Sequence, residues 1–221
     1  MPYGSILGYE YKRSPTGELV VNADGKSYVR ADELSILGNI QPDWLGGFTN
    51  TFTYKGLSLS ALIDVRMGGE VYSWSRYDQN AKGTGVWTNV RENLTVEGVI
   101  DNGDGTYTPS VQNNVLGQDY FAARSWGNIG EEFVLDATNA SLREVTLGYT
   151  FNKKTLESTP FDTARLSLVA RNVMYLYRDS KFVEMGIAPD TAFSPTAAAQ
   201  GYESFSMPTT RSLGFNLSVT F

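Results

Sequence analysis

A stretch between residues 68 and 139 holds the side chains best suited to binding a ligand. Flat aromatic faces beside acids and amides are suited to stacking on sugar rings, and five residues are candidates for that role: Trp74, Tyr77, Trp87, Tyr120 and Trp126. Tyr72 and Phe121 are further aromatics of the same stretch. The alternative is that a loop of this length needs a small aromatic core of its own. The sequence leaves both interpretations open.

Catalytic chemistry finds little support. The chain has no histidine and no cysteine, which removes the commonest general base and the usual zinc ligands. Glu131 and Glu132 could form a carboxylate pair, but neighbours on a strand point to opposite faces. The segment 101–107, DNGDGTY, lacks the spacing of a calcium loop and predicts a glycine-rich hairpin turn instead. We therefore expect no enzyme activity, no cofactor and no metal site.

The elements that must position these loops are five amphipathic strands. In the clearest, Leu59 and Ile63 share an apolar face, while Ser60 and Asp64 lie on the other face. One face suits lipid and the other water, and most of the segments have about the length that a tilted strand needs to cross a bilayer. The five strands are expected near residues 44–54, 57–67, 140–151, 163–171 and 211–221.

Charged residues respect this division. Five charged residues fall on the polar parity and are expected to face the lumen of a barrel: Asp64, Arg66, Glu144, Arg165 and Arg171. Arg143 and Arg211 share the apolar parity. Each starts its strand, where a long side chain can reach the headgroups. A cation on the lipid face costs roughly 2 to 4 kcal/mol at the bilayer midplane and little near its edge.

Connection lengths give an independent indication of a membrane barrel. Such barrels have short turns on the periplasmic side and long loops outside. Here the links 68–139 and 172–210 are long, whereas Lys55 with Gly56 and the link 152–162 are short. The lengths alternate, which predicts an extracellular loop region at 1–43 followed by a barrel segment at 44–221.

The expected fold class is therefore all-β: an antiparallel transmembrane β-barrel segment with long extracellular loops. Five strands are too few to close a barrel, so they form part of a larger one. The apolar face of the last strand is the expected signal for the barrel-assembly machinery, and it comprises Phe215, Leu217, Val219 and Phe221.

Composition narrows the alternatives. The net charge of -6 argues against a nucleic-acid partner. The sequence contains no run of 18 apolar residues, so it predicts no transmembrane helix. The first 13 residues do not form a signal peptide, so a targeting segment is expected outside this sequence. A soluble β-sandwich that binds carbohydrate remains the alternative, in which the apolar faces pack against each other.

Several segments, in order along the chain, resemble the C-terminal end of SusC/RagA-type TonB-linked outer membrane proteins. They are Leu37–Tyr72, Asn139–Phe151, the pair Arg171 and Asn172, and Met207–Phe221, preceded by Gly4–Arg13 and Gly17–Lys26. The resemblance implies a 22-stranded barrel with an amino-terminal plug in the outer membrane of a Gram-negative, Bacteroidetes-type bacterium. It also implies energy from TonB through regions absent here, and a SusD-like lipoprotein that captures oligosaccharides or peptides for import.

Overall fold

The computed structural model describes residues 1–190 and 200–221, which form two compact units. The sheet unit comprises residues 43–68, 138–178 and 208–221. The loop unit comprises residues 1–42, 69–137 and 179–207. Residues 191–199, part of the expected outer loop 172–210, lie outside the described residues.

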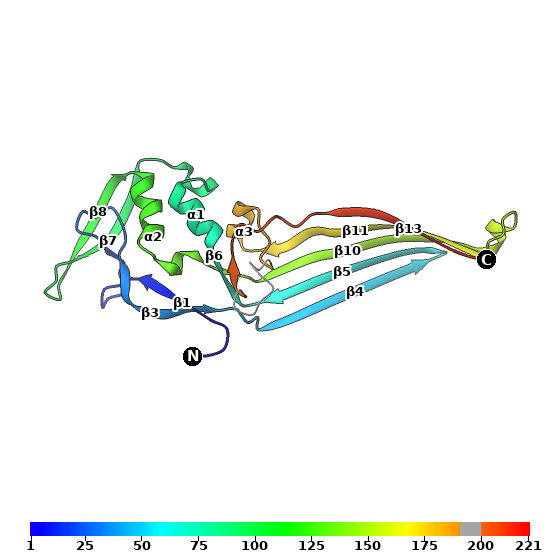
Figure 1. Cartoon of the computed structure of the whole chain (residues 1–221), viewed down its shortest axis with the longest axis horizontal. Helices are drawn as coiled ribbons and strands as arrows, with labels where there is room; N and C mark the ends of the chain where they lie inside the picture. The colour runs from blue at the N-terminus through cyan, green and yellow to red at the C-terminus, as the bar shows by residue number, and fades with distance from the viewer. Residues whose placement is uncertain (191–199) are drawn as a thin grey trace. The chain divides into compact units, whose positions relative to one another are not determined.

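The sheet unit is a five-stranded antiparallel sheet in which every strand pairs with the next of the five along the chain (Figure 1). The order β4-β5-β10-β11-β13 confirms the antiparallel, up-and-down sheet that the alternation predicted. The strands are β4 (Trp44–Tyr54), β5 (Leu57–Met67), β10 (Asn139–Phe151), β11 (Thr163–Arg178) and β13 (Ser212–Thr220).

The register places apolar side chains opposite one another on one face of this sheet. Leu59 pairs with Leu147, and Leu168 pairs with Phe215. These side chains stay exposed: 42% for Leu59 and 78% for Phe215. A β-sandwich would bury them against a second sheet, and the described residues of the sheet unit form only one sheet.

A β-bulge in β10 corrects the face expected for Arg143. The register shifts between Leu142 and Glu144 against both neighbouring strands, so the residue parity changes at this point. Arg143 therefore lies on the polar face, where its Nε donates to Asp64 Oδ2 at 3.0 Å. The prediction that it shares the apolar face, based on parity alone, is wrong.

Two strand limits differ from expectation. β11 continues to Arg178, seven residues beyond the expected end at Arg171, because irregular pairing with β10 absorbs the break in alternation at Asn172. Asn172 adopts a φ of 50°, and its side-chain amide donates to the Thr210 carbonyl at 3.1 Å. β13 is shorter than expected, so Arg211 and Phe221 lie just outside it.

Connections at the two ends of the sheet differ in size. At one end, Lys55 and Gly56 form a tight hairpin with φ values of 46° and 87°, as two-residue turns require. The other link at this end, 152–162, contains only the short 3-10 helix Lys153–Leu156. At the opposite end β4, β5, β10, β11 and β13 all connect to segments of the loop unit.

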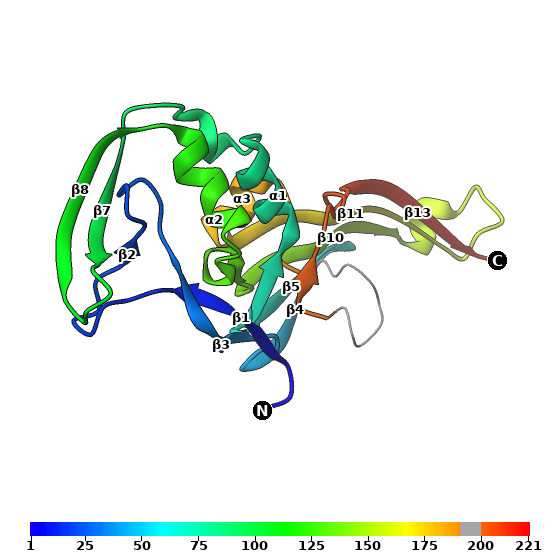
Figure 2. The same ribbon diagram turned by 60° about the vertical axis from the view of Figure 1, so that its left-hand side comes forward.

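The loop unit is a folded body rather than a set of irregular loops (Figure 2). Its strands are β1 (Ser5–Tyr11), β2 (Val20–Val21), β3 (Arg30–Asn39), β6 (Glu70–Ser73), β7 (Leu94–Asp101), β8 (Tyr107–Val115), β9 (Val134–Asp136) and β12 (Tyr202–Glu203). Its helices are α1 (Trp74–Lys82), α2 (Ala123–Trp126) and α3 (Ser180–Met185), together with two 3-10 helices, Val86–Asn89 and Gly130–Phe133, and a π-helix, Gln118–Ala122.

Local sequence explains where α1 begins and ends. Ser73 caps it by accepting a hydrogen bond from the Arg76 backbone N–H at 3.1 Å. Gly83 ends it with a φ of 65°, the left-handed conformation that glycine adopts without steric cost. The helix is thus fixed at both ends by residues of suitable type.

Two clusters of buried apolar side chains are recorded among the described residues, and both lie in the loop unit. One contains Val71, Leu135, Ala137 and Phe182. The other contains Val21, Val96 and Val115. Residues far apart in the sequence meet in each cluster, which gives the expected loops a hydrophobic core. No helix in the described part of the chain has the length and apolar character needed to span a membrane.

Gly98 in β7 provides a test of this packing. A Cβ at this position would lie 2.4 Å from the Leu19 carbonyl oxygen, so Gly98→Ala must push β2 away from β7. We expect a loss of about 1–3 kcal/mol in the free energy of unfolding, as for other overpacked sites. Chemical unfolding in detergent, followed by circular dichroism, measures it. Gly214→Ala is the control, because a Cβ there meets no atom within 4 Å; equal stability of the two variants would contradict the packing.

Candidate binding cavity

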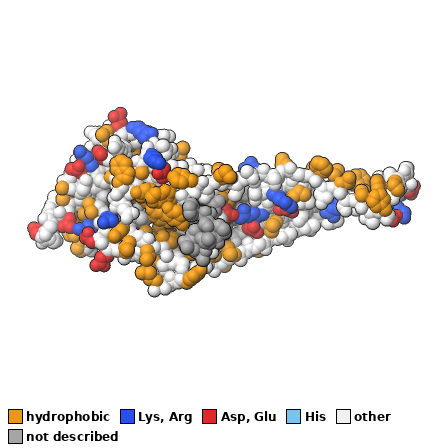
Figure 3. Space-filling view, viewed as in Figure 1, with side chains coloured by type: hydrophobic (Ala, Val, Ile, Leu, Met, Phe, Trp, Pro, Cys, Tyr) orange, Lys and Arg blue, Asp and Glu red, His pale blue; other side chains and the backbone are white. Residues whose placement is uncertain are grey.

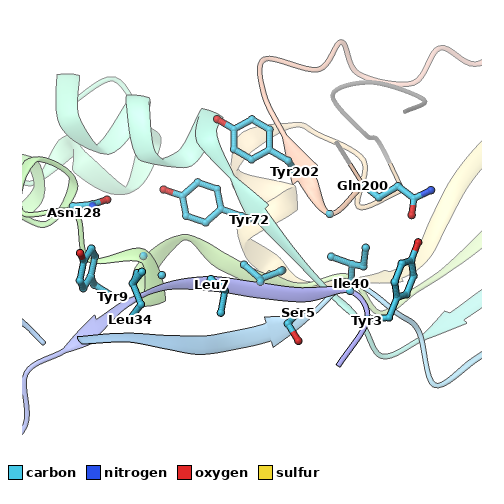
Figure 4. A pocket seen from close by; sticks show the side chains of 15 residues that line it. Tyr3, Ser5, Leu7, Tyr9, Leu34, Ile40, Tyr72, Asn128, Gln200 and Tyr202 are labelled. Carbon is cyan, nitrogen blue, oxygen red and sulfur yellow. The ribbon is translucent and has the colours of Figure 1, made fainter. Parts of the chain in front are cut away.

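The loop unit contains a cavity of about 510 Å³ rich in tyrosine (Figure 4). One wall is β1 with the residues that precede it, and it contributes Tyr3, Leu7 and Tyr9. The opposite wall contributes Tyr72 from β6 and Tyr202 from β12. We call this the tyrosine cavity. Its volume falls within the range typical of small-molecule sites.

Two stacked tyrosines form one wall of the cavity. Tyr72 and Tyr202 are paired residues of the parallel strands β6 and β12. Their ring centroids lie 5.8 Å apart, and the ring planes differ by 10°. The Tyr72 backbone N–H also donates to the Gly201 carbonyl at 2.8 Å. Sheet pairing therefore holds both rings in place before any ligand arrives.

A buried carboxylate anchors the strand that carries Tyr202. Glu203 has no exposed surface and accepts hydrogen bonds from the Ser73 hydroxyl at 2.6 Å and the Ser75 hydroxyl at 2.7 Å. Both serines lie at the start of α1, where the helix dipole favours a negative charge. The Ser75 hydroxyl also accepts the Phe205 backbone N–H at 2.6 Å. These bonds tie the segment around Tyr202 to α1.

The cavity is polar without being charged. None of the described residues that line it is acidic or basic, although Asn128 and Gln200 contribute amides. Burial raises the pKa of Tyr72 above its ordinary value, and burial with the nearby Glu203 carboxylate raises that of Tyr202. Both hydroxyls therefore stay protonated at neutral pH and can donate hydrogen bonds. The lining suits a neutral ligand with apolar and hydrogen-bonding parts.

The aromatic residues singled out in the sequence lie elsewhere in the loop unit. Trp74 and Tyr77 stack on each other with centroids 4.4 Å apart. The Arg76 guanidinium lies 4.0 Å from the centre of the Trp87 ring, and the Arg124 guanidinium lies 3.9 Å from that of Tyr120. These contacts within the loop unit are of the kind expected of a small aromatic core, and all four side chains are half-buried.

Trp126 differs from the other four. It is 65% exposed and lines a second cavity, of about 440 Å³. None of the five predicted aromatics lines the tyrosine cavity. Its own aromatic residues, including Tyr3, Tyr9 and Tyr202, escaped sequence reasoning because they come from segments distant from 68–139. The sequence feature that could have located them is the cluster of tyrosines in segment 3–11, together with Tyr202.

The five charges expected to face a lumen share the polar face of the sheet unit. Arg171 Nε donates to Glu144 Oε2 at 3.0 Å across paired strands. Arg165 donates to the Ser58 hydroxyl at 2.9 Å. Arg66 donates to the Gly68 carbonyl at 3.4 Å. Figure 3 shows acidic and basic side chains next to one another along the strands. Cross-strand pairing accounts for the Arg171 and Arg165 contacts, whereas Arg66 bonds to a residue just beyond the end of its own strand.

Residues proposed as an assembly signal lie on the opposite face. Phe215, Leu217 and Val219 belong to β13 and pair with apolar residues of β11. Phe221 follows the strand, and its ring packs edge-on against Phe161 with centroids 5.1 Å apart. Phe221 therefore extends the apolar surface beyond the last paired residue.

The two carboxylates considered for catalysis have structural partners. Glu131 and Glu132 lie on a 3-10 helix, not on a strand as the sequence suggested. Glu131 accepts the Tyr11 backbone N–H at 2.9 Å, and Glu132 accepts the Tyr11 hydroxyl at 2.6 Å. Their role is to hold β1, which forms a wall of the tyrosine cavity.

The glycine-rich segment 101–107 is the hairpin turn between β7 and β8, as predicted. It is closed by the Asn102 backbone N–H, which donates to the Thr106 carbonyl at 3.1 Å. Among residues 1–190 and 200–221, no group of three acidic side chains is arranged to hold a metal ion.

Comparison with known proteins agrees with this fold. No protein-family model matches the chain. TonB-dependent receptor P39 of Formosa agariphila is 28% identical over 195 residues, which cover 86% of this chain and 17% of that receptor. TonB-dependent receptor P26 of the same organism is 24% identical over 208 residues, covering 90% of this chain and 19% of the receptor.

Solved structures of similar fold cover almost the whole of this chain. The RagAB peptide transporter matches with a TM-score of 0.60 and 19% identity, over 98% of this chain and 23% of that chain. The RagAB peptide importer in its 'open-open' state matches with a TM-score of 0.59 and 15% identity, over 98% and 22%. The resemblance to TonB-linked outer membrane proteins is confirmed, and the chain spans less than a quarter of each of these proteins.

Glu203→Gln tests the anchor of the tyrosine cavity. The amide cannot accept both serine hydroxyls as the carboxylate does, so we expect about 1–3 kcal/mol less stability and faster amide exchange at Phe205. Chemical unfolding and hydrogen exchange by mass spectrometry measure the two effects. Glu18→Gln is the matched control, because Glu18 accepts the Thr16 hydroxyl at 2.9 Å at an exposed site. Unchanged exchange at Phe205 would rule out the anchoring role.

Proposed function

We propose that this chain is part of the barrel wall and outer loops of a TonB-dependent outer membrane transporter that imports nutrients. The observation that supports this most directly is the single sheet with an exposed apolar face and a charged, hydrogen-bonded face. A soluble protein rarely leaves so large an apolar surface open. In a membrane that surface faces lipid, and the polar face borders a water-filled or plugged interior.

The polar face supports a lumenal position. Its ion pairs, such as Arg143 with Asp64 and Arg171 with Glu144, are 3.0 Å long and would be costly in contact with lipid. Facing an interior, they stay hydrated and can also bond to a plug. The plug and the TonB-contacting region would be supplied by parts of the protein outside this sequence.

Outside the membrane, the loop unit would hold the substrate together with a SusD-like lipoprotein. Residues 69–137 and 179–207 and the segment before β4 belong to this unit, and they join one end of the sheet. The tyrosine cavity offers ring faces and hydrogen-bond donors to oligosaccharides or peptides. The solved RagAB structures are described as those of a peptide transporter, and the tyrosine cavity has the chemistry to hold either substrate class.

Assembly and location follow from the same proposal. The chain would be inserted by the barrel-assembly machinery, which would read Phe215, Leu217, Val219 and Phe221. It would reside in the outer membrane of a Gram-negative bacterium of the Bacteroidetes type, as the Formosa relatives suggest. It would carry out transport without enzymatic chemistry.

Solubility gives the first test. The chain should aggregate in buffer and become monodisperse by size-exclusion chromatography only in detergent, because the apolar face of the sheet needs an apolar environment. A monodisperse monomer in buffer alone would contradict the proposal that the chain lies in a membrane.

A pair of neighbouring residues on β4 tests which face meets lipid. Phe48 lies on the apolar face opposite Ile63, and Thr49 lies on the polar face opposite Leu62. Both are exposed and central in the strand. Phe48→Arg should cost about 2 to 4 kcal/mol of membrane stability at the midplane, whereas Thr49→Arg should cost little. Flotation with phospholipid vesicles measures the bound fraction, and equal binding of both variants would contradict the proposed orientation.

A further inference from the structure

The second cavity, lined by Trp126, has a different chemistry from the tyrosine cavity. Its walls are the end of α1 at 80–83, Arg91, the π-helix Gln118–Ala122 with the two residues before it, and Trp126 at the end of α2. We call it the Trp126 cavity. The charged residues among its described lining are Lys82 and Arg91, both cations.

The walls of the Trp126 cavity are fixed by hydrogen bonds. The Asn80 amide donates to the Phe121 carbonyl at 2.7 Å, and its oxygen accepts the Trp87 indole N–H at 3.2 Å. The Arg91 guanidinium donates to the Gly83 carbonyl at 2.9 Å, and the Gly117 backbone N–H donates to the Arg91 carbonyl at 2.7 Å. The cavity is therefore formed in advance of any ligand, which lowers the entropic cost of binding.

The π-helix is a second sign of a site. A helix with i to i+5 bonding is rare and occurs frequently at functional sites. Here it supplies Gln118, whose amide can donate and accept, and it brings Phe121 into the wall. Gly117, just before it, has no room for a side chain, because a Cβ would lie 2.8 Å from the Val90 carbonyl oxygen. The Gly117 backbone therefore packs closely against the backbone at Val90.

Three chemical features converge on this cavity. Trp126 presents an exposed indole face, which suits the apolar face of a pyranose ring. Arg91 and Lys82 offer charged donors for a carboxylate, and Gln118 can bond to hydroxyl groups. Lys82 is paired with Asp78 at 2.9 Å, and its side chain is 65% exposed.

We propose that the Trp126 cavity binds a hexuronate unit of an acidic oligosaccharide. The volume of about 440 Å³ exceeds that of a single sugar and lies within the range of small-molecule sites. The inference deepens the proposed function, on which its physiological role rests, by naming a substrate class. It assigns recognition of the charged sugar to Trp126 and Arg91, away from the neutral tyrosine cavity.

Tri-galacturonate is the probe, and the full chain in detergent is titrated by isothermal calorimetry. Trp126→Ala and Arg91→Gln should each weaken binding by about tenfold or more, because each removes a direct contact, one of them charge-assisted. Lys82→Gln should weaken binding without disturbing the Gly83 contact that Arg91 makes. Trp44→Phe, at an exposed tryptophan of the sheet unit, should bind as the parent does.

Two comparison ligands test whether the cavity selects an acidic sugar. Maltotriose, a neutral sugar, should bind about tenfold or more weakly than tri-galacturonate, and Arg91→Gln should leave its affinity unchanged. Tri-glutamate carries the charge without the ring and should bind weakly. Tighter binding of tri-glutamate than of tri-galacturonate, or full tri-galacturonate binding by Trp126→Ala or Arg91→Gln, would each overturn the proposal.

The result of the binding test can be distinguished from the result of the vesicle-flotation test of the proposed function. Phe48→Arg impairs only the sheet unit and should retain tri-galacturonate binding. If the parent chain binds tri-galacturonate but does not float with vesicles, the membrane role is overturned and the binding site is retained. Flotation without tri-galacturonate binding would keep the membrane role and overturn the site.

Discussion

The two-residue period of the strands is the constraint on which the sheet unit depends. Because successive side chains point to opposite faces, five strands with matched parity give one apolar and one polar face. Antiparallel pairing between successive strands then satisfies the backbone hydrogen bonds within the sheet. Lipid can accept the apolar face only if charges stay off it, and the register keeps Asp64, Glu144, Arg165 and Arg171 together on the other.

The β-bulge at Arg143 shows how this constraint is maintained where the sequence breaks it. A regular strand would place the guanidinium on the apolar face. One extra residue changes the parity, so Arg143 meets Asp64 while Leu142 stays opposite Ile63. An exposed ion pair of this kind contributes little stability. Its main effect is to keep a charge away from the apolar surface.

In the loop unit, contacts between distant segments take the place of alternation. β6, β9 and β12 come from three separate parts of the chain and form one small sheet. Glu203 joins the last of them to the start of α1, and Glu132 holds Tyr11 at the other wall of the tyrosine cavity. Two cavities of different charge result, one neutral and one cationic. Under the proposed function, the two cavities of the loop unit would hold different parts of a substrate.

The five strands, their order and the polar face could be predicted from the amino-acid sequence, because side-chain alternation is a local property of each strand. The resemblance to TonB-linked proteins was likewise visible in the order of several segments along the chain. The sequence could not determine the place of Arg143, since a bulge depends on the partner strands. Nor could it find the tyrosine cavity, whose residues Tyr3, Tyr72 and Tyr202 meet only after long-range pairing. Among the predicted aromatics, only exposure distinguished Trp126 from the four half-buried residues that contact other side chains. Each of these features depends on contacts between segments that are distant in the sequence, so it became visible only in the folded chain.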